Sequence, residues 1–274
     1  MAKHDDQCRK SISCPAAQQS GRLPPGSGRV QLAAARPGIV GGSLRRNASP
    51  CSRRCVHAFV VEDGLAATMQ PSDVARALRR AVMARAQEVL GRATLPRFFS
   101  GHESDGSPAQ TQSRPHLTFL FDPRSARLLI VAPHVVDRRD STREERTHLE
   151  TLDTAMTDFR ELRAGPAGRL MVRASAIDPH ADPLFAPSRV WESVTPYQVT
   201  RHTKHVGAAE ALSADVRAEC RRRGLPEPRV TPLDPRGVPG VGLVGGARLT
   251  FEVAVEGPVV LGKSRHLGGG LFAG

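Results

Sequence analysis

The chain has 274 residues, which is enough for one large domain or two small ones. It carries 39 Lys and Arg against 27 Asp and Glu, and 39% of it is hydrophobic, which excludes a wholly disordered protein. No apolar stretch approaches the ~20 residues that span a membrane. The polar first residues also lack a secretory signal. We therefore expect a cytoplasmic protein with no membrane partner, and its net charge of +12 makes a polyanion such as RNA a reasonable ligand.

The amino-terminal residues 1–56 are the most basic part of the chain. They hold ten Lys and Arg but only two acidic residues, and Ser, Gly, Pro and Ala dominate without a helical or strand period. We predict a low-complexity, disordered basic leader. The metal-ligating residue types in and beside it are Cys8, Cys14, Cys51, Cys55 and His57. Their spacing is not that of paired zinc ligands, so scattered thiols are the favoured interpretation and we expect no metal.

Residues 57–180 predict a first folded unit of mixed helix and strand. Val74, Leu78, Val82 and Val89 recur at helical spacing, and Thr142 followed by Glu145 forms a capping-box pattern that begins a second helix. The expected strands are 57–62, 116–121, 127–133 and 169–176, and the expected helices are 72–90 and 142–162. The resulting order, β-α-β-β-α-β, is that of a ferredoxin-like (RRM-like) unit.

A second unit is predicted over residues 189–274. The expected elements are strands at 190–195, 228–233 and 247–255, a helix at 208–223 and a glycine-rich end at 257–274. This order is typical of a shortened copy of the first unit. The predicted fold class is therefore α+β, with two ferredoxin-like units in tandem and a carboxyl-terminal glycine-rich loop.

The glycine-rich end is the most informative segment. It has no acidic residue after Glu256. Glycines let a backbone approach a phosphate chain closely, and basic side chains supply the opposite charge. We predict an ordered RNA-binding loop, the alternative being a flexible tail. Its candidate RNA-binding residues are Gly262, Lys263, Arg265, His266, Gly268, Gly269 and Gly270.

A second basic cluster occupies residues 195–205. Tyr197 is of a type that stacks on RNA bases, and Arg201 and Lys204 are of types that bind phosphates. We predict an RNA-binding loop here, and a solvated loop with chance charge is the alternative.

Two histidines are candidates for proton transfer. His102 follows Ser100 and Gly101 in a loop rich in Gly and Ser, and His116 begins a predicted strand. A neutral histidine can take the proton of a ribose 2′-hydroxyl, with Glu103 or Asp105 to orient it. His116 can equally be a half-buried hydrogen-bonding residue. The GxSxG motif of serine esterases is absent, which argues against that class.

Several segments together resemble one known family. They are ALRRAVMARA, LPRFFSGHESDGSPAQTQSRPHLTFLF, RLLIVAPH, VWESVTPYQVTRHTKH, DVRAECRRRGLPEP and GPVVLGKSRHLGGGLFAG, in order over residues 70–274. This text resembles the CRISPR-associated Cas-five/Cas-six fusion family of type I-U (I-G) systems, called Csb-two or the GSU type. The resemblance covers mainly its carboxyl-terminal, Cas-six-like half, because residues 1–56 do not match the half that precedes it.

The resemblance implies an endoribonuclease that processes CRISPR repeat RNA in antiviral defence without a metal or cofactor. A base removes the 2′-hydroxyl proton, the oxygen attacks the phosphorus, and a 2′,3′-cyclic phosphate results. His102 is the expected base and His116 the second candidate. The expected sources of positive charge at the cleaved phosphate are Arg201, Lys204, Lys263 and Arg265.

Two alternatives stay open on the sequence. One is a non-catalytic subunit that holds crRNA among the other subunits of a type I interference complex. The other is a truncated remnant of the fusion.

Overall fold

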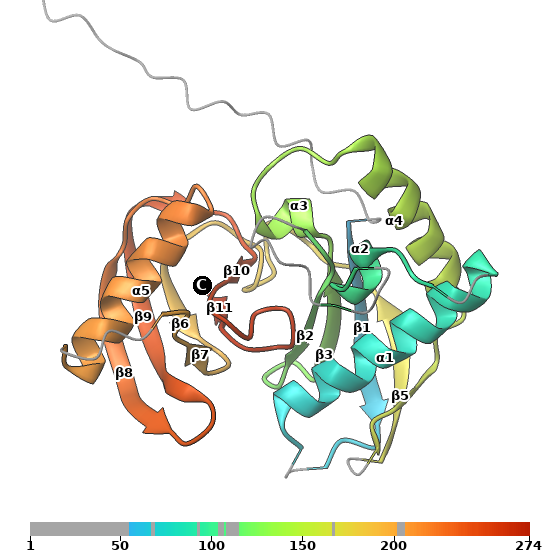
Figure 1. Ribbon diagram of the computed structural model, residues 1–274, viewed down its shortest axis with the longest axis horizontal. Helices are drawn as coiled ribbons and strands as arrows, with labels where there is room; N and C mark the ends of the chain where they lie inside the picture. The colour runs from blue at the N-terminus through green and yellow to red at the C-terminus, as the bar shows by residue number, and fades with distance from the viewer. Residues whose placement is uncertain are drawn as a thin grey trace, which may run out of the picture. The chain divides into compact units, whose positions relative to one another are not determined.

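The computed structural model describes residues 55–66, 69–91, 94–103, 107, 115–165, 168–201 and 206–274. These residues belong to one compact unit, residues 47–274, which contains two antiparallel sheets and several helices (Figure 1). The fold is therefore α+β. The predicted leader falls outside the described residues as far as residue 54. None of the described helices is long and apolar enough to cross a membrane.

The first sheet has the strand order β2-β3-β1-β5-β4, and every neighbouring pair is antiparallel. Its helices and strands follow the predicted β-α-β-β-α-β order, with two short helices and one short strand added. The elements are β1 (Val56–Asp63), α1 (Pro71–Leu90), α2 (Arg97–Ser100), β2 (Thr118–Asp122), β3 (Arg127–Val131), α3 (Pro133–Val136), α4 (Arg143–Met156), β4 (Glu161–Arg163) and β5 (Arg169–Ser175).

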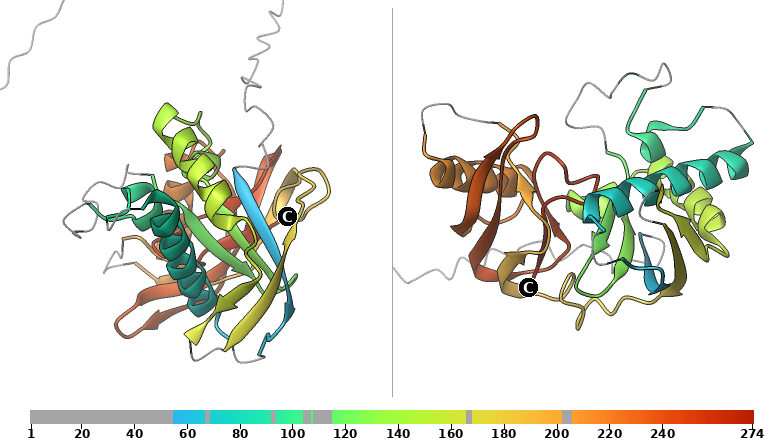
Figure 2. Two further views of the ribbon diagram at one scale, coloured as in Figure 1. Left: turned by 90° about the vertical axis from the view of Figure 1, so that its right-hand side faces the viewer. Right: turned by 90° about the horizontal axis from the view of Figure 1, so that it is seen from below.

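Both faces of the first sheet are covered, which explains why β2 and β3 are buried throughout. Side chains alternate between the faces of a strand. Phe119 and Phe121 therefore pack with the helices α1 and α4, which lie on one face (Figure 2). Leu120, between them, packs on the other face against Leu271 near the end of the chain.

Helix α1 begins with a proline in its first turn and ends at Gly91, which has a positive φ of 59°. Val74, Leu78 and Val82 are fully buried, as predicted. The prediction for Val89 is wrong, because its side chain is exposed. Val89 shares a side of the helix with Leu78 and Val82, but it lies in the last turn, beyond Ala86, which is the last buried residue of α1.

Helix α4 starts with the predicted capping box. The hydroxyl of Thr142 accepts from the Glu145 backbone, and the Glu145 carboxylate accepts from the Thr142 backbone. The helix ends at Met156, however, and not near Leu162. Asp158 adopts a positive φ of 58°, and the chain then enters β4.

The second sheet has the order β10-β11-β6-β9-β7, and β8 pairs with β9 as well. Among the described residues it carries one long helix, α5, which lies against β8 and β9 (Figure 1). Its elements are β6 (Ser188–Ser193), β7 (Tyr197–Gln198), α5 (Ala208–Arg222), β8 (Arg229–Val238), β9 (Gly242–Val255), β10 (Val259–Val260) and β11 (Leu271–Ala273).

The two sheets share a hydrophobic cluster in addition to the core that each has of its own. Leu129 and Val131 of the first sheet pack there with Val260, Leu271 and Ala273 of the second. The glycine-rich loop between β10 and β11, red in Figure 1, extends from this cluster to β2. It is this loop that brings predicted site residues from both sheets together.

Candidate functional site

The glycine-rich loop is ordered and bonds to the edge strand β2. Leu267 forms a parallel β-bridge with Phe119, and the Phe119 N–H donates to the His266 carbonyl oxygen at 3.3 Å. At its other end the loop contacts β7, because the Lys263 N–H donates to the Gln198 carbonyl at 2.9 Å and the Gly270 N–H to that of Pro196 at 2.9 Å. The alternative of a flexible tail is wrong.

The glycines of this loop allow close packing within the protein. A Cβ on Gly262 would lie 2.7 Å from the Gln198 carbonyl oxygen, and a Cβ on Gly268 would lie 2.9 Å from the Cβ of Ala75. A Cβ on Gly270 would overlap the Leu261 carbonyl. The N–H groups of Gly262, Gly269 and Gly270 already donate to protein acceptors. The prediction that these glycines accommodate a phosphate chain is therefore not needed to explain them.

The loop also stacks one predicted site histidine on another. The rings of His116 and His266 lie with centroids 3.7 Å apart and planes inclined by 26°. The Nδ1 of His266 is 3.2 Å from the hydroxyl of Thr118. Burial, and then the proximity of His116, Arg265 and Arg223, holds the pKa of His266 well below its ordinary value of 6.5. His266 is therefore neutral at neutral pH.

His102 lies beside this stack. Gly101, with a φ of 69°, ends α2, and a Cβ at this glycine would be 3.0 Å from Nε2 of His116. The absence of a side chain at Gly101 thus lets the backbone pack on the His116 ring and presents His102 as the next residue. A hydrogen bond of 2.9 Å from the Leu117 N–H to the Phe98 carbonyl holds the two segments together.

The hydrogen bonds of His102 assign its tautomer. Its Nδ1 lies 2.8 Å from the carbonyl oxygen of Ser100, which can only accept, so Nδ1 carries the proton. In the neutral ring Nε2 then carries the lone pair, and it makes no hydrogen bond to any residue that the structure describes. The Ser100 hydroxyl accepts from the His102 backbone N–H at 3.1 Å, which further restrains the turn.

Arg265 is a half-buried cation whose charge is not compensated by an ion pair. It makes no hydrogen bond or ion pair with the described part of the chain, and its Nε is buried without an acceptor. Burial, and then the positive charge of Arg223, lowers its pKa to about 10. A cation in this position favours the approach of an anion, since charge removed from water needs a partner.

The carboxylates nearest to Arg265 are engaged by other arginines. Glu219 of α5 is bound by Arg222 at 2.5 Å and by Arg223 at 3.0 Å, and it also accepts from the Gly262 N–H at 3.1 Å. Burial by itself would raise the pKa of Glu219, but Arg223, the Gly262 N–H and Arg222 hold it below its ordinary value. Asp137 pairs with Arg223 at 2.7 Å.

Tyr197 is fully buried, so its ring is not available to stack on an RNA base as predicted. Its ring is fully buried beneath Gly262, and its hydroxyl donates to Asp215 at 2.5 Å. Burial and the adjacent Asp215 carboxylate raise the pKa of Tyr197. The same carboxylate accepts from the backbone and hydroxyl of Thr200. Tyr197 therefore supports the loop from below.

The remaining predicted residues divide into two groups. Arg201 and Lys263 are exposed. Lys204 and Asp105 lie outside the described residues. The sequence did not single out Arg79, Glu219 and Arg223, because they lie in or directly after helices in which charged residues recur without a distinguishing pattern.

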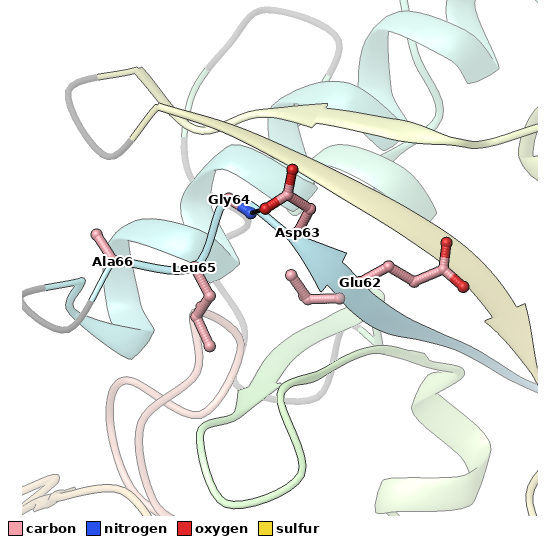
Figure 3. Close-up of a pocket in the computed structure, with 6 residues that line it drawn as sticks. Glu62, Asp63, Gly64, Leu65 and Ala66 are labelled. Atoms are coloured by element: carbon pink, nitrogen blue, oxygen red, sulfur yellow. Dashed lines mark hydrogen bonds between the residues drawn. The ribbon is translucent and has the colours of Figure 1, made fainter.

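A surface hollow at the end of β1 contains none of the residues of the candidate site. It is lined by residues 61–66 (Figure 3). Its two charged side chains are carboxylates: Glu62 pairs with Arg173 at 2.5 Å, and Asp63 accepts from the Gly64 N–H at 2.7 Å. An acidic hollow disfavours RNA, so it does not change the choice of site. Among the described residues no group of three His, Cys, Asp or Glu side chains could hold a metal ion.

No protein-family model matches the chain, and no curated protein matches its sequence. The resemblance to the CRISPR-associated family therefore stays a prediction from motifs. The candidate site is formed by His102, His116, His266 and Arg265.

Proposed function

We propose that the protein is an endoribonuclease that cleaves RNA by attack of a ribose 2′-hydroxyl, with His102 as the general base. The observation that carries the proposal is the hydrogen bond from Nδ1 of His102 to the Ser100 carbonyl. It makes Nε2 the basic nitrogen, which general-base catalysis requires. In the reaction Nε2 takes the 2′-hydroxyl proton, and the 2′-oxygen bonds to phosphorus as the P–O5′ bond breaks. The leaving 5′-oxygen takes a proton from water, which gives a 2′,3′-cyclic phosphate and a 5′-hydroxyl.

The surroundings of His102 support this proposal. Arg265 supplies an uncompensated positive charge beside the histidine stack, which suits an RNA phosphate. His116 remains the second candidate for proton transfer, because Gly101 places it next to His102.

The resemblance supplies the class of RNA. We propose CRISPR repeat RNA as the substrate, in a maturation step that needs no metal. The element order of residues 56–175 and the strand order β2-β3-β1-β5 support a ferredoxin-like first unit. The second part is a less complete copy, since one long helix accompanies its sheet in the described residues.

A second candidate function is binding without cleavage, as a crRNA-holding subunit. The uncompensated charge of Arg265 fits this function as well, because a cation can hold an RNA phosphate without any proton transfer. Both functions use Arg265, and they differ only in whether His102 transfers a proton.

The test uses the full chain and repeat RNA from a CRISPR array next to its gene, in EDTA. We expect one cut that a 2′-deoxy nucleotide at that position abolishes. His102→Ala should lower the cleavage rate at least about 100-fold while RNA affinity is kept. His180→Ala, at an exposed histidine, is the matched control. Tight binding without any cut would support the holding subunit, and normal cleavage by His102→Ala would overturn the assignment of the base.

A further inference from the structure

Arg79 reaches from the middle of α1 to the turn that carries His102. Its Nη2 donates to the Ser100 carbonyl oxygen and lies 3.3 Å from Nδ1 of His102. It is half-buried, and no ion pair joins it to an acidic residue in the described part of the chain. Burial lowers its pKa, yet a guanidinium remains charged at neutral pH. At neutral pH the charged guanidinium of Arg79 therefore binds a backbone carbonyl oxygen and not a carboxylate.

The Ser100 carbonyl oxygen accepts from both Arg79 and His102. A guanidinium has only donors, and Nδ1 of His102 must donate to a carbonyl oxygen 2.8 Å away. Nη2 of Arg79 and Nδ1 of His102 are therefore 3.3 Å apart because both donate to the Ser100 carbonyl oxygen, and not because they bond to each other. A carbonyl that also binds a cation is held firmly in place, because charge-assisted hydrogen bonds are stronger than neutral ones.

We propose that Arg79 is a positioning residue for His102. By holding the Ser100 carbonyl against Nδ1–H, it selects the tautomer in which Nε2 carries the lone pair. Its meaning for catalysis rests on the proposed function, but the tautomer itself does not. A role limited to joining α1 to α2 would change stability and leave the tautomer as it is.

The test reads the tautomer of His102 by long-range ¹H–¹⁵N NMR, at a pH where an ordinary histidine is neutral. The signal is assigned by its loss in His102→Ala. We expect the Nδ1–H tautomer in the wild type and in Arg79→Lys, whose ammonium still donates to Ser100. Arg79→Met removes the donor, so we expect a mixture of tautomers. Arg76→Met, at an exposed arginine on the same helix that pairs with Asp73 at 2.9 Å, should match the wild type.

The same variants are compared in RNA cleavage. We expect Arg79→Met to lower kcat roughly 10- to 100-fold with little change in KM, and Arg79→Lys to restore most of it. A wild-type protein with the proton on Nε2, or an Arg79→Met protein that keeps the Nδ1–H tautomer, would overturn the proposal. Should Arg79→Met change the tautomer in a protein that cleaves no RNA, the positioning role would stand and the proposed function would fall.

Discussion

The stacked rings of His116 and His266 require that His266 stay neutral in the folded protein, because burial disfavours its charged form. Two imidazolium rings with centroids 3.7 Å apart would repel each other, and Arg265 and Arg223 add further positive charge nearby. Acid should therefore weaken the attachment of the glycine-rich loop to β2.

This predicts a measurable dependence of stability on pH. The pKa of His266 in the folded chain is below its ordinary value of 6.5, so at pH 7 both states are neutral at this ring. As pH falls below 6.5 the unfolded chain binds a proton that the folded chain does not, and the free energy of unfolding falls by up to about 1.4 kcal/mol per pH unit. Urea unfolding between about pH 7 and pH 5 measures this slope.

Replacing the ring identifies the source of that slope. We expect His266→Asn to reduce it, and His180→Ala, at an exposed histidine, to leave it unchanged. Part of the slope will persist in His266→Asn, because burial also lowers the pKa of His57. An unchanged slope in His266→Asn would contradict the assignment.

At the scale of elements, the turn that joins β10 to β11 depends on Gly270. Its φ of 64° is in the left-handed region, and a Cβ would overlap the Leu261 carbonyl. The Leu261 N–H donates to the Gly270 carbonyl oxygen at 2.9 Å, which keeps the two backbone segments close together. Gly240, in the β8–β9 hairpin, has a similar φ of 73° but open space around it. Substitution at Gly240 therefore tests backbone strain alone, whereas substitution at Gly270 tests backbone strain together with steric overlap.

We expect Gly270→Ala to destabilise the protein by roughly 3 kcal/mol or more and Gly240→Ala by only about 1 kcal/mol. Both replacements carry the cost of a left-handed backbone, and only Gly270→Ala must also move the Leu261 backbone, which follows β10. Urea denaturation of the two variants gives the comparison. Equal losses would show that the close approach at Gly270 does not determine stability.

At the scale of the whole molecule, the hydrophobic cluster shared by the two sheets should make them unfold together. Leu271 is fully buried in it, next to Leu120 and Leu129 of the first sheet. We expect Leu271→Ala to lower the free energy of unfolding by about 2–5 kcal/mol. Because the cluster includes residues of both sheets, the two sheets should lose the same amount of unfolding free energy.

Two probes measure the sheets separately. Fluorescence of Trp191, the one tryptophan of the chain, reports the core of the second sheet, and hydrogen exchange of the β3 amides reports the first. Val253→Ala, at an exposed valine of β9, is the control and should leave both transitions in place. A Leu271→Ala protein whose second sheet unfolds before the first would show that the sheets are energetically independent.

Local patterns in the sequence were sufficient for several elements. The capping box at Thr142 and the helical spacing of Val74, Leu78 and Val82 are confirmed because they depend on neighbours within one or two turns. The end of α4 was not predictable in the same way. Asp158 takes a left-handed conformation without a glycine to signal it, and β4 is specified by pairing with β5.

For the site, the order of residues along the chain showed which residue types were available: histidines in a Gly/Ser loop and a basic, glycine-rich end. Their roles depend on how the chain packs. It buried Tyr197 against Asp215, used the glycines for close backbone packing, and stacked His266 of one sheet's loop on His116 of the other. Burial and contacts between residues that are far apart in the chain arise from how the sheets pack. Thr118 and His266, whose side chains lie within hydrogen-bonding distance, are separated by 148 positions.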